Sequence, residues 1–471
     1  MARNFTWLRW RRILLVTIAF LLLCLLNYEY PSSHISVDDD SENIQALNLK
    51  DDTHHSNTSG SFVLALEYYE QLTCATRNLL QLCNIAQNLK ARVVTPFLLR
   101  SLLNGIPDFN STRRHYYPLN TVYDVPKLNE TFHTITGTHL VTFNQFIQHA
   151  PRDVVLVDTL YSYEAKTEYK TFNDSGFELF NCPNHLSPDQ IDTARNAENN
   201  LQKHTVVNHF VVKKFICLPR TTHDITTDQI KQFIGIKPHT IVFNQWRGCA
   251  YHSCEVKAPR NVVNSARHRI LYHSVTSQRS LTYKDISLPY NNAVVSSAKA
   301  FLDKISLAFP FVSVHVRIEK LAIVNRKING LTKCCMNLLD NLVKSFRQKY
   351  NTNHFMTITD IGKYGTIGCT DRTCIQHVKV VESALTSMNL TQYKFDPELT
   401  HASDNPSFVS LVEMHTLAMG DRLVVVGHGS FKYQLITQFL ITNAHKKVYY
   451  ICTEKGNILN EFGHLDKKCS Q

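Results

Sequence analysis

The stretch FVSVHVRIEK, from Phe311 to Lys320, places the tightest constraint on the fold. Apolar residues alternate there with polar ones, and this period of two predicts a β-strand. Side chains two apart on a strand point the same way, so we expect His315, Arg317 and Glu319 to line one face. Ligands of open α/β sheets bind beyond the carboxyl ends of the strands, where these three side chains suit an anion. The alternative is an edge strand with one solvated face.

The residues around this stretch alternate between helix and strand patterns. An amphipathic helix pattern precedes it, and a second covers 334–350. A strand over 354–360 follows and ends in Asp360, and a helix starting at Pro406 carries Glu413. This alternation predicts a parallel sheet of the α/β class.

A glycine-rich turn between a strand and a helix supplies the second half of the predicted site. Residues 423–426 read as a buried strand, 427–430 as a tight turn and 431–441 as a helix. Free backbone N–H groups around Gly429 and the positive end of the helix dipole would face a ligand there. The strand that carries Arg317 and this glycine-rich turn are both suited to a phosphate. Because both are expected at one edge of a parallel sheet, they predict an anion site there.

The N-terminal part of the ordered chain contains a predicted βαβ unit. FVLALEYY reads as a strand and turn, a helix runs from about Gln71 to Lys90, and ARVVTPF reads as the next strand. Its first loop is expected to contain Glu70 and Gln71, where such folds place chemistry.

Two more strand patterns, at 151–161 and 239–248, end in polar residues. Asp158, Asn244 and Gln245 are expected at loop positions that follow the apolar strand cores. Trp246 and Arg247 could line a binding cleft, but a core tryptophan beside a surface arginine is the simpler expectation.

The N-terminus predicts a membrane-anchored protein that enters the secretory pathway. Residues 1–12 carry four arginines and read as a cytosolic tail, and 13–30 read as an uncleaved type II anchor. A cleaved signal peptide is the rival, but no small-residue cleavage site follows. Residues 31–60 are polar and acidic and read as a disordered stem. Glycosylation sequons along the chain agree with a luminal location; they lie at Asn57, Asn110, Asn129, Asn173 and Asn389.

The chain has 13 cysteines, of which Cys24 lies in the predicted anchor. The other twelve make disulfides the default in an oxidising compartment, and a zinc site the less favoured option. Two C-x4-C pairs could close small rings: Cys249 with Cys254, and Cys369 with Cys374. Cys74 and Cys83 lie about 13 Å apart on a helix and so need other partners. The adjacent Cys334 and Cys335 need distant partners too.

The formal net charge of +11 excludes little by itself. A basic chain could bind nucleic acid, but a luminal protein would not meet any. The basic residues are also scattered rather than gathered in a stripe. We read the charge as general suitability for anionic substrates or acceptors.

The ordered motifs resemble those of the GDP-fucose protein O-fucosyltransferase superfamily. They are H-x-R-x-E, a strand ending in Thr-Asp, a helix with an acid, and a strand leading to Gly-x-Gly-Ser-Phe. HVRIEKLA is similar to the version in the plant O-fucosyltransferase-like branch. The resemblance covers mainly 295–445, with a fainter echo in Tyr69 to Phe97.

This resemblance implies a GT-B-type enzyme with two Rossmann-like domains facing across a cleft. An acceptor-side domain over 61–290 and a nucleotide-sugar-binding domain over 291–471 are expected. Such enzymes transfer fucose from GDP-fucose to a protein or glycan hydroxyl, invert the anomeric centre and need no metal or other cofactor. The ordered sequence contains no D-x-D motif. Golgi or endoplasmic reticulum membrane is the implied location.

The resemblance also implies roles for individual residues. Arg317 would contact the diphosphate with support from His315, while Ser430 and Phe431 would meet the phosphate or fucose from the helix start. Asp360 and Glu413 would lie near the nucleotide. The backbone N–H of Gly429 would donate a hydrogen bond to the departing diphosphate. Because no metal is expected, such donors would have to stabilise its negative charge.

The N-terminal loop departs from the family pattern. Relatives have a glycine-rich G-x-x-N-Q there, whereas this chain reads LEYYEQ, which retains Gln71 and places Glu70 in the active position. Glu70 is the expected base for the acceptor hydroxyl, and His428 is a remoter candidate.

Other functions remain open at this point. The altered loop suits a catalytically inactive, glycosyltransferase-like protein that binds glycans or partners, and another nucleotide sugar could replace GDP-fucose. A luminal sulfotransferase would need a phosphate loop near Phe62 to Lys90, and none is evident there.

Overall fold

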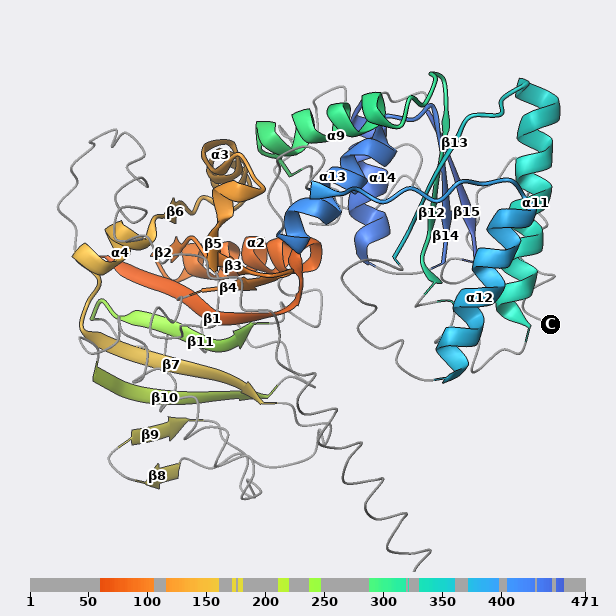
Figure 1. The fold of residues 1–471 in the computed structure, drawn as a ribbon. Helices are drawn as coiled ribbons and strands as arrows, with labels where there is room; N and C mark the ends of the chain where they lie inside the picture. The colour runs from red at the N-terminus through yellow and green to blue at the C-terminus, as the bar shows by residue number, and fades with distance from the viewer. Residues whose placement is uncertain are drawn as a thin grey trace, which may run out of the picture. The chain divides into compact units, whose positions relative to one another are not determined.

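We describe the fold from a computed structural model (Figure 1). It describes residues 60–105, 116–160, 172–174, 177–180, 211–219, 237–246, 288–318, 321, 330–360, 372–397, 405–427, 430–442 and 446–452. The chain divides into two units, Met1–Thr58 and Ser59–Gln471, and all of these residues belong to the second. The predicted tail, anchor and stem lie outside the described residues, apart from Gly60 at the end of the stem. No helix among the residues described combines the length and apolar character needed to cross a membrane.

The first sheet is built around β1 (Ser61–Gln71), which runs directly into α2 (Leu72–Asn88). β1 pairs in parallel with β2 (Ala91–Val94), which confirms the predicted βαβ unit. On its other sides it pairs in parallel with β11 (Thr240–Trp246) and antiparallel with β4 (Leu102–Asn104). Glu70 and Gln71 therefore end a strand, and the prediction that they lie in a loop is wrong.

Seven more described strands complete this mixed sheet, which has the order β5-β3-β4-β1-β11-β7-β10-β9-β8. Off this path, β2 pairs with β1 and β6 pairs with β2. The seven strands are β3 (Phe97–Leu99), β5 (Tyr116–Pro118), β6 (Leu140–Val141), β7 (Asp153–Leu160), β8 (Phe172–Asp174), β9 (Phe177–Phe180) and β10 (Val211–Pro219). Two short helices flank it, α3 (Val125–Thr136) and α4 (Phe143–His149). β7 and β11 confirm the two strand patterns in the middle of the chain. Asp158, Asn244 and Gln245 lie within these strands rather than in loops.

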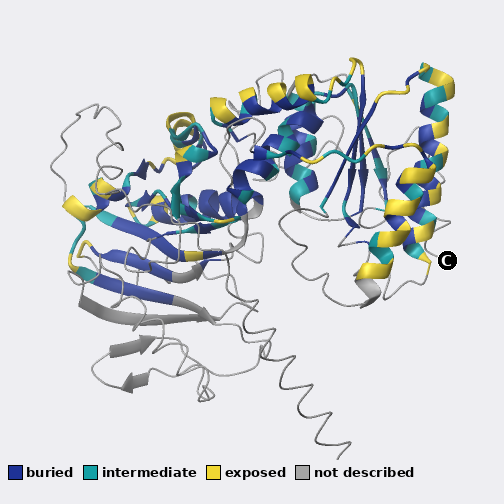
Figure 2. Ribbon diagram, in the orientation of Figure 1, coloured by how far each residue is buried: buried dark blue, intermediate teal, exposed yellow. Residues whose placement is uncertain are grey.

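The second sheet is parallel and four-stranded, with the order β13-β12-β14-β15. Its strands are β12 (Val312–Val316), β13 (Phe355–Thr359), β14 (Arg422–Val426) and β15 (Lys447–Ile451). Its helices are α9 (Asn292–Lys304), α11 (Leu331–Tyr350), α12 (Arg372–Ser387), α13 (Pro406–Ala418) and α14 (Ser430–Thr442). β12 and β13 are buried along their whole length, and Figure 2 shows exposed residues on α9, α11 and α12.

β12 is a central strand that is buried along its whole length, so the edge-strand alternative is wrong. Its period of two arises because one face packs into an apolar cluster with α11 and the other lies under α13 and α14. On that second face the Ser313 hydroxyl donates a hydrogen bond to the Leu417 carbonyl of α13, at 2.6 Å. The strand ends at Val316, which leaves Arg317 just beyond it.

Helix α13 begins as the sequence predicts. Pro406 is its first residue, and the Asn405 side chain accepts hydrogen bonds from the backbone N–H groups of Ser407 and Phe408. Proline has no backbone N–H, but this costs no hydrogen bond here, because the N–H of a first helical residue has no partner within the helix.

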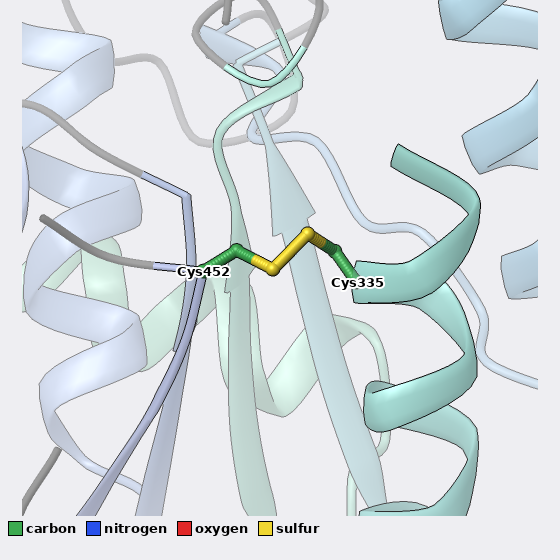
Figure 3. The surroundings of a disulfide bond; sticks show 2 residues. All are labelled: Cys335 and Cys452. Atoms are coloured by element: carbon green, nitrogen blue, oxygen red, sulfur yellow. A yellow bond between two sulfur atoms is a disulfide. The ribbon is translucent and has the colours of Figure 1, made fainter. Parts of the chain in front are cut away.

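A disulfide joins Cys335, near the start of α11, to Cys452, just after β15 (Figure 3). Cys334 is also in a disulfide, so both adjacent cysteines pair elsewhere, as predicted. Cys83 is a buried free thiol, which shows that the even cysteine count does not mean complete pairing. The predicted small rings include Cys249, Cys254 and Cys369, which lie outside the described residues.

Candidate functional site

The carboxyl ends of β12 and β14 meet at one edge of the second sheet. Val316 pairs with Val426, and the Arg317 N–H donates a hydrogen bond to the Val426 carbonyl at 2.9 Å. Gly427 follows with φ of 86°, and a Cβ there would lie 3.0 Å from the Arg317 carbonyl oxygen. Only glycine tolerates both this conformation and this approach. Gly427 therefore packs directly against Arg317.

The first turn of α14 lies against the same strand. The Phe431 ring stacks on the His315 ring, with centroids 5.0 Å apart and planes inclined by 26°. Ser430 is the first residue of α14, a helix of 13 residues whose amino end carries the positive end of its dipole. Gly429 and His428 lie outside the described residues. The arginine and the helix start thus belong to one place, as the sequence predicts.

His315 is buried, with 4% of its surface exposed. Burial lowers its pKa to about 3, and the charge of Arg317 contributes to the shift. Its Nδ1 atom has no hydrogen-bond partner in the described part of the chain. A neutral imidazole has one N–H donor and one acceptor nitrogen, so His315 can offer a ligand a hydrogen bond but not a positive charge.

Asp360 orients Arg317. Its Oδ2 atom lies 3.2 Å from the Arg317 Nε, and its Oδ1 accepts a hydrogen bond from the Ile318 N–H at 2.7 Å. A charged pair of this kind fixes both the guanidinium and the backbone that follows β12. Asp360 is thus the carboxylate that pairs with Arg317. Glu319, which the sequence places on the same face as Arg317, lies outside the described residues.

Glu413 lies on α13, and its carboxylate accepts a hydrogen bond from the Phe395 N–H at 3.1 Å. Burial raises its pKa to about 7, although that hydrogen bond and the charge of Lys394 act in the opposite direction. Glu413 therefore holds the segment before α13 in place.

Two glutamates lie toward the carboxyl end of β1. Glu70 is the penultimate residue of the strand, and its side chain is outside the description. Glu67 is exposed, while Leu66 and Tyr68 on either side are buried at 7% and 0% exposure. Register places it between Asn104 of β4 and Gln245 of β11. The sequence analysis missed Glu67, although a charged residue inside an apolar strand is a usable signal.

Trp246 belongs to the core and does not line a cleft. It is 4% exposed, its ring meets Phe243 edge to face, and its Nε1 donates to the Asn78 carbonyl of α2 at 2.7 Å. Arg247 lies outside the described residues.

Within the described ranges, no cluster of three or more histidines, cysteines or acids could hold a metal ion. The groups that the structure gathers around the candidate site are instead suited to an anion. They are a guanidinium, a neutral imidazole and the amino end of a helix.

Comparisons with known proteins gave structural likenesses only. The chain matches no protein-family model and no curated protein by sequence. A crystal structure of POFUT1 in complex with GDP-fucose is 11% identical, with 85% of this chain and 99% of that chain covered and a TM-score of 0.46. POFUT1 in complex with GDP gives 11% identity, 84% and 99% coverage and a TM-score of 0.44. At these values the likenesses do not assign a function to the chain.

Glu413 makes the stability of the protein depend on pH. Because its folded-state pKa is raised from 4.5 to about 7, its stabilising contribution is complete below pH 4.5 and is lost as the pH rises through 7. At about 1.4 kcal/mol per pKa unit, the loss is about 3 kcal/mol. Glu413→Gln cannot ionise and should remove this part of the pH dependence.

Urea unfolding of wild type and Glu413→Gln between pH 4 and pH 8 measures this difference. Glu382→Gln, at an exposed position on α12, is the control and should follow wild type. Parallel stability curves for wild type and Glu413→Gln would contradict the raised pKa.

Proposed function

We propose that this chain is an inverting, metal-independent glycosyltransferase that binds a nucleoside diphosphate sugar. The observation that carries the proposal is the single edge at which Arg317, the Gly427 turn and the start of α14 come together. Breaking the bond between a sugar and a nucleoside diphosphate leaves negative charge on the departing diphosphate. A permanently charged, forked guanidinium and helix N–H groups are donors that stabilise such charge without a metal.

The donor is proposed to be GDP-fucose. This choice is supported by the ordered motifs around His315, Arg317, Asp360 and Phe431, which resemble those of the O-fucosyltransferase superfamily. The acceptor would be a protein or glycan hydroxyl. The anchor pattern at 13–30 supports a luminal enzyme of the Golgi or endoplasmic reticulum membrane.

The acceptor hydroxyl needs a base, and a carboxylate near the end of β1 is proposed for this role. Glu70 occupies the position that the family pattern marks. Glu67 is the neighbouring carboxylate that the fold leaves exposed among buried residues. A glutamate in such a position would take the proton as the hydroxyl attacks the sugar.

A nucleotide-binding protein without catalysis is the second candidate. One observation favours it: β1 runs into α2 without a glycine-rich loop, so the close approach of backbone to donor seen in the family pattern is not built into this sequence. Binding of GDP without transfer to any acceptor would support this alternative.

Arg317→Ala is expected to lower transfer and donor hydrolysis by about 10²- to 10³-fold, the usual cost of losing one donor to a developing oxyanion. Arg317→Lys keeps the charge but loses the fork, so it should recover part of the activity. The rates of transfer and hydrolysis in both variants are measured as the release of GDP and labelled sugar from GDP-fucose. Unchanged activity in Arg317→Ala, at an unchanged melting temperature, would remove the proposed mechanism.

Glu70→Gln and Glu67→Gln test the base separately. The variant that lacks the base should lose about 10²- to 10⁴-fold in kcat, because a general base typically contributes that much. Its affinity for GDP, measured by calorimetry, should stay at the wild-type value. Full activity in both variants would exclude a carboxylate base on β1.

A further inference from the structure

A buried charged residue links the two sheets. Arg77 on α2 is only 3% exposed, and its Nη2 donates a hydrogen bond to the Oε1 of Gln434 on α14, at 3.1 Å. Gln434 is fully buried. These residues are 357 positions apart in sequence, so the contact is purely tertiary.

The hydrogen bonds continue from Gln434 into a buried network that a pair of stacked tyrosine rings links back to α2. Its Nε2 donates to the Tyr290 hydroxyl at 3.3 Å, and that hydroxyl donates to the Met414 sulfur of α13 at 3.2 Å. The Tyr290 ring stacks on the Tyr123 ring, with centroids 5.9 Å apart. The Tyr123 hydroxyl lies 3.1 Å from the Thr76 hydroxyl of α2. The network thus starts and ends on neighbouring residues of α2.

The helices in this network are the ones that carry the candidate site. α2 starts immediately after Glu70 and Gln71 at the end of β1. Gln434 lies one turn after Phe431 on α14, and Met414 follows Glu413 on α13. A contact between Arg77 and Gln434 therefore acts within a turn of the helix end proposed to bind the diphosphate.

A network of this kind is poorly explained by stability alone. Well-packed apolar residues of similar volume commonly replace buried charged networks without loss of stability, whereas fixed hydrogen-bond geometry allows only one arrangement. Burial raises the pKa of Tyr290 to about 12, so this hydroxyl stays protonated and keeps its hydrogen bond to Met414. This network is therefore suited to fixing the position of α14 relative to α2.

We propose that Arg77 is a positioning residue that, through Gln434, holds the first turn of α14 at a fixed distance from the glutamates at the end of β1. This inference rests on the proposed function. The anion donors belong to β12 and α14, and the carboxylates belong to β1, so Arg77 would align two groups that act in one step. Misplacement of reacting groups by about 1 Å costs about 10²-fold in rate.

The proposal predicts that turnover and donor binding respond differently. The double substitution Arg77→Met with Gln434→Leu removes both polar partners, which avoids leaving either one buried without a hydrogen bond. We expect kcat to fall by about 10- to 100-fold, with the dissociation constant for GDP within about twofold of wild type. Gln434→Glu keeps an acceptor for Arg77 and should retain the wild-type kcat.

Arg92→Met is the matched control. Arg92 is a partly buried arginine on β2, in the first sheet, and its guanidinium lies 4.5 Å from the centroid of the Phe62 ring, outside the network. It should leave both kcat and GDP affinity unchanged. Circular dichroism and melting temperatures check that each variant is folded before its kcat is measured.

The outcomes separate this proposal from the proposed function. Failure of the wild-type protein to bind GDP would overturn the proposed function itself. Wild-type kcat in the double variant, or equal losses of kcat and GDP affinity, would overturn the role of Arg77 alone. A Gln434→Glu protein as slow as the double variant would also overturn it, because the acceptor for Arg77 is retained there.

Discussion

The parallel pairing of β12 with β14 is the interaction on which the candidate site depends. It places Arg317 beside Gly427, and the hydrogen bond from the Arg317 N–H to the Val426 carbonyl carries the pairing one residue past the strand. Gly427 approaches Arg317 closely, and Phe431 in the first turn of α14 stacks on His315. Asp360, from the neighbouring strand β13, completes the arrangement by holding the guanidinium. Three adjacent parallel strands thus supply one site, as expected for the carboxyl edge of such a sheet.

Local patterns in the sequence predicted much of this arrangement. The strand at Val312–Val316, the helix start at Pro406 and the βαβ unit at β1 follow from periodicity and capping, which depend on near neighbours. The surroundings of β12 could not be predicted in this way. Its alternating polar residues suggested solvent, but the Ser313 hydroxyl is hydrogen-bonded to the Leu417 carbonyl and the His315 ring is covered by the Phe431 ring. Both partners are more than a hundred residues away. Contacts with residues so distant in sequence cannot be predicted from the neighbouring residues.

Helix α2 shows the same limit. Its apolar positions, among them Leu72, Leu79 and Ala86, predicted one buried face, and the structure buries them. It also buries the polar Thr76 and Asn78, and it buries Arg77 on the opposite side, where Gln434 accepts its hydrogen bond. A helix with polar residues on one side usually faces water, so only the fold could show that this side makes contacts. Helix α12 and strand β15 were not predicted at all.

A crystal structure of the chain from residue 60 onward with GDP, grown without divalent metal, tests the central claim most directly. The account predicts that the diphosphate lies between the Arg317 guanidinium and the amino end of α14, within hydrogen-bond distance of both. A diphosphate bound elsewhere, or neighbouring side chains filling the space between those two groups, would contradict it.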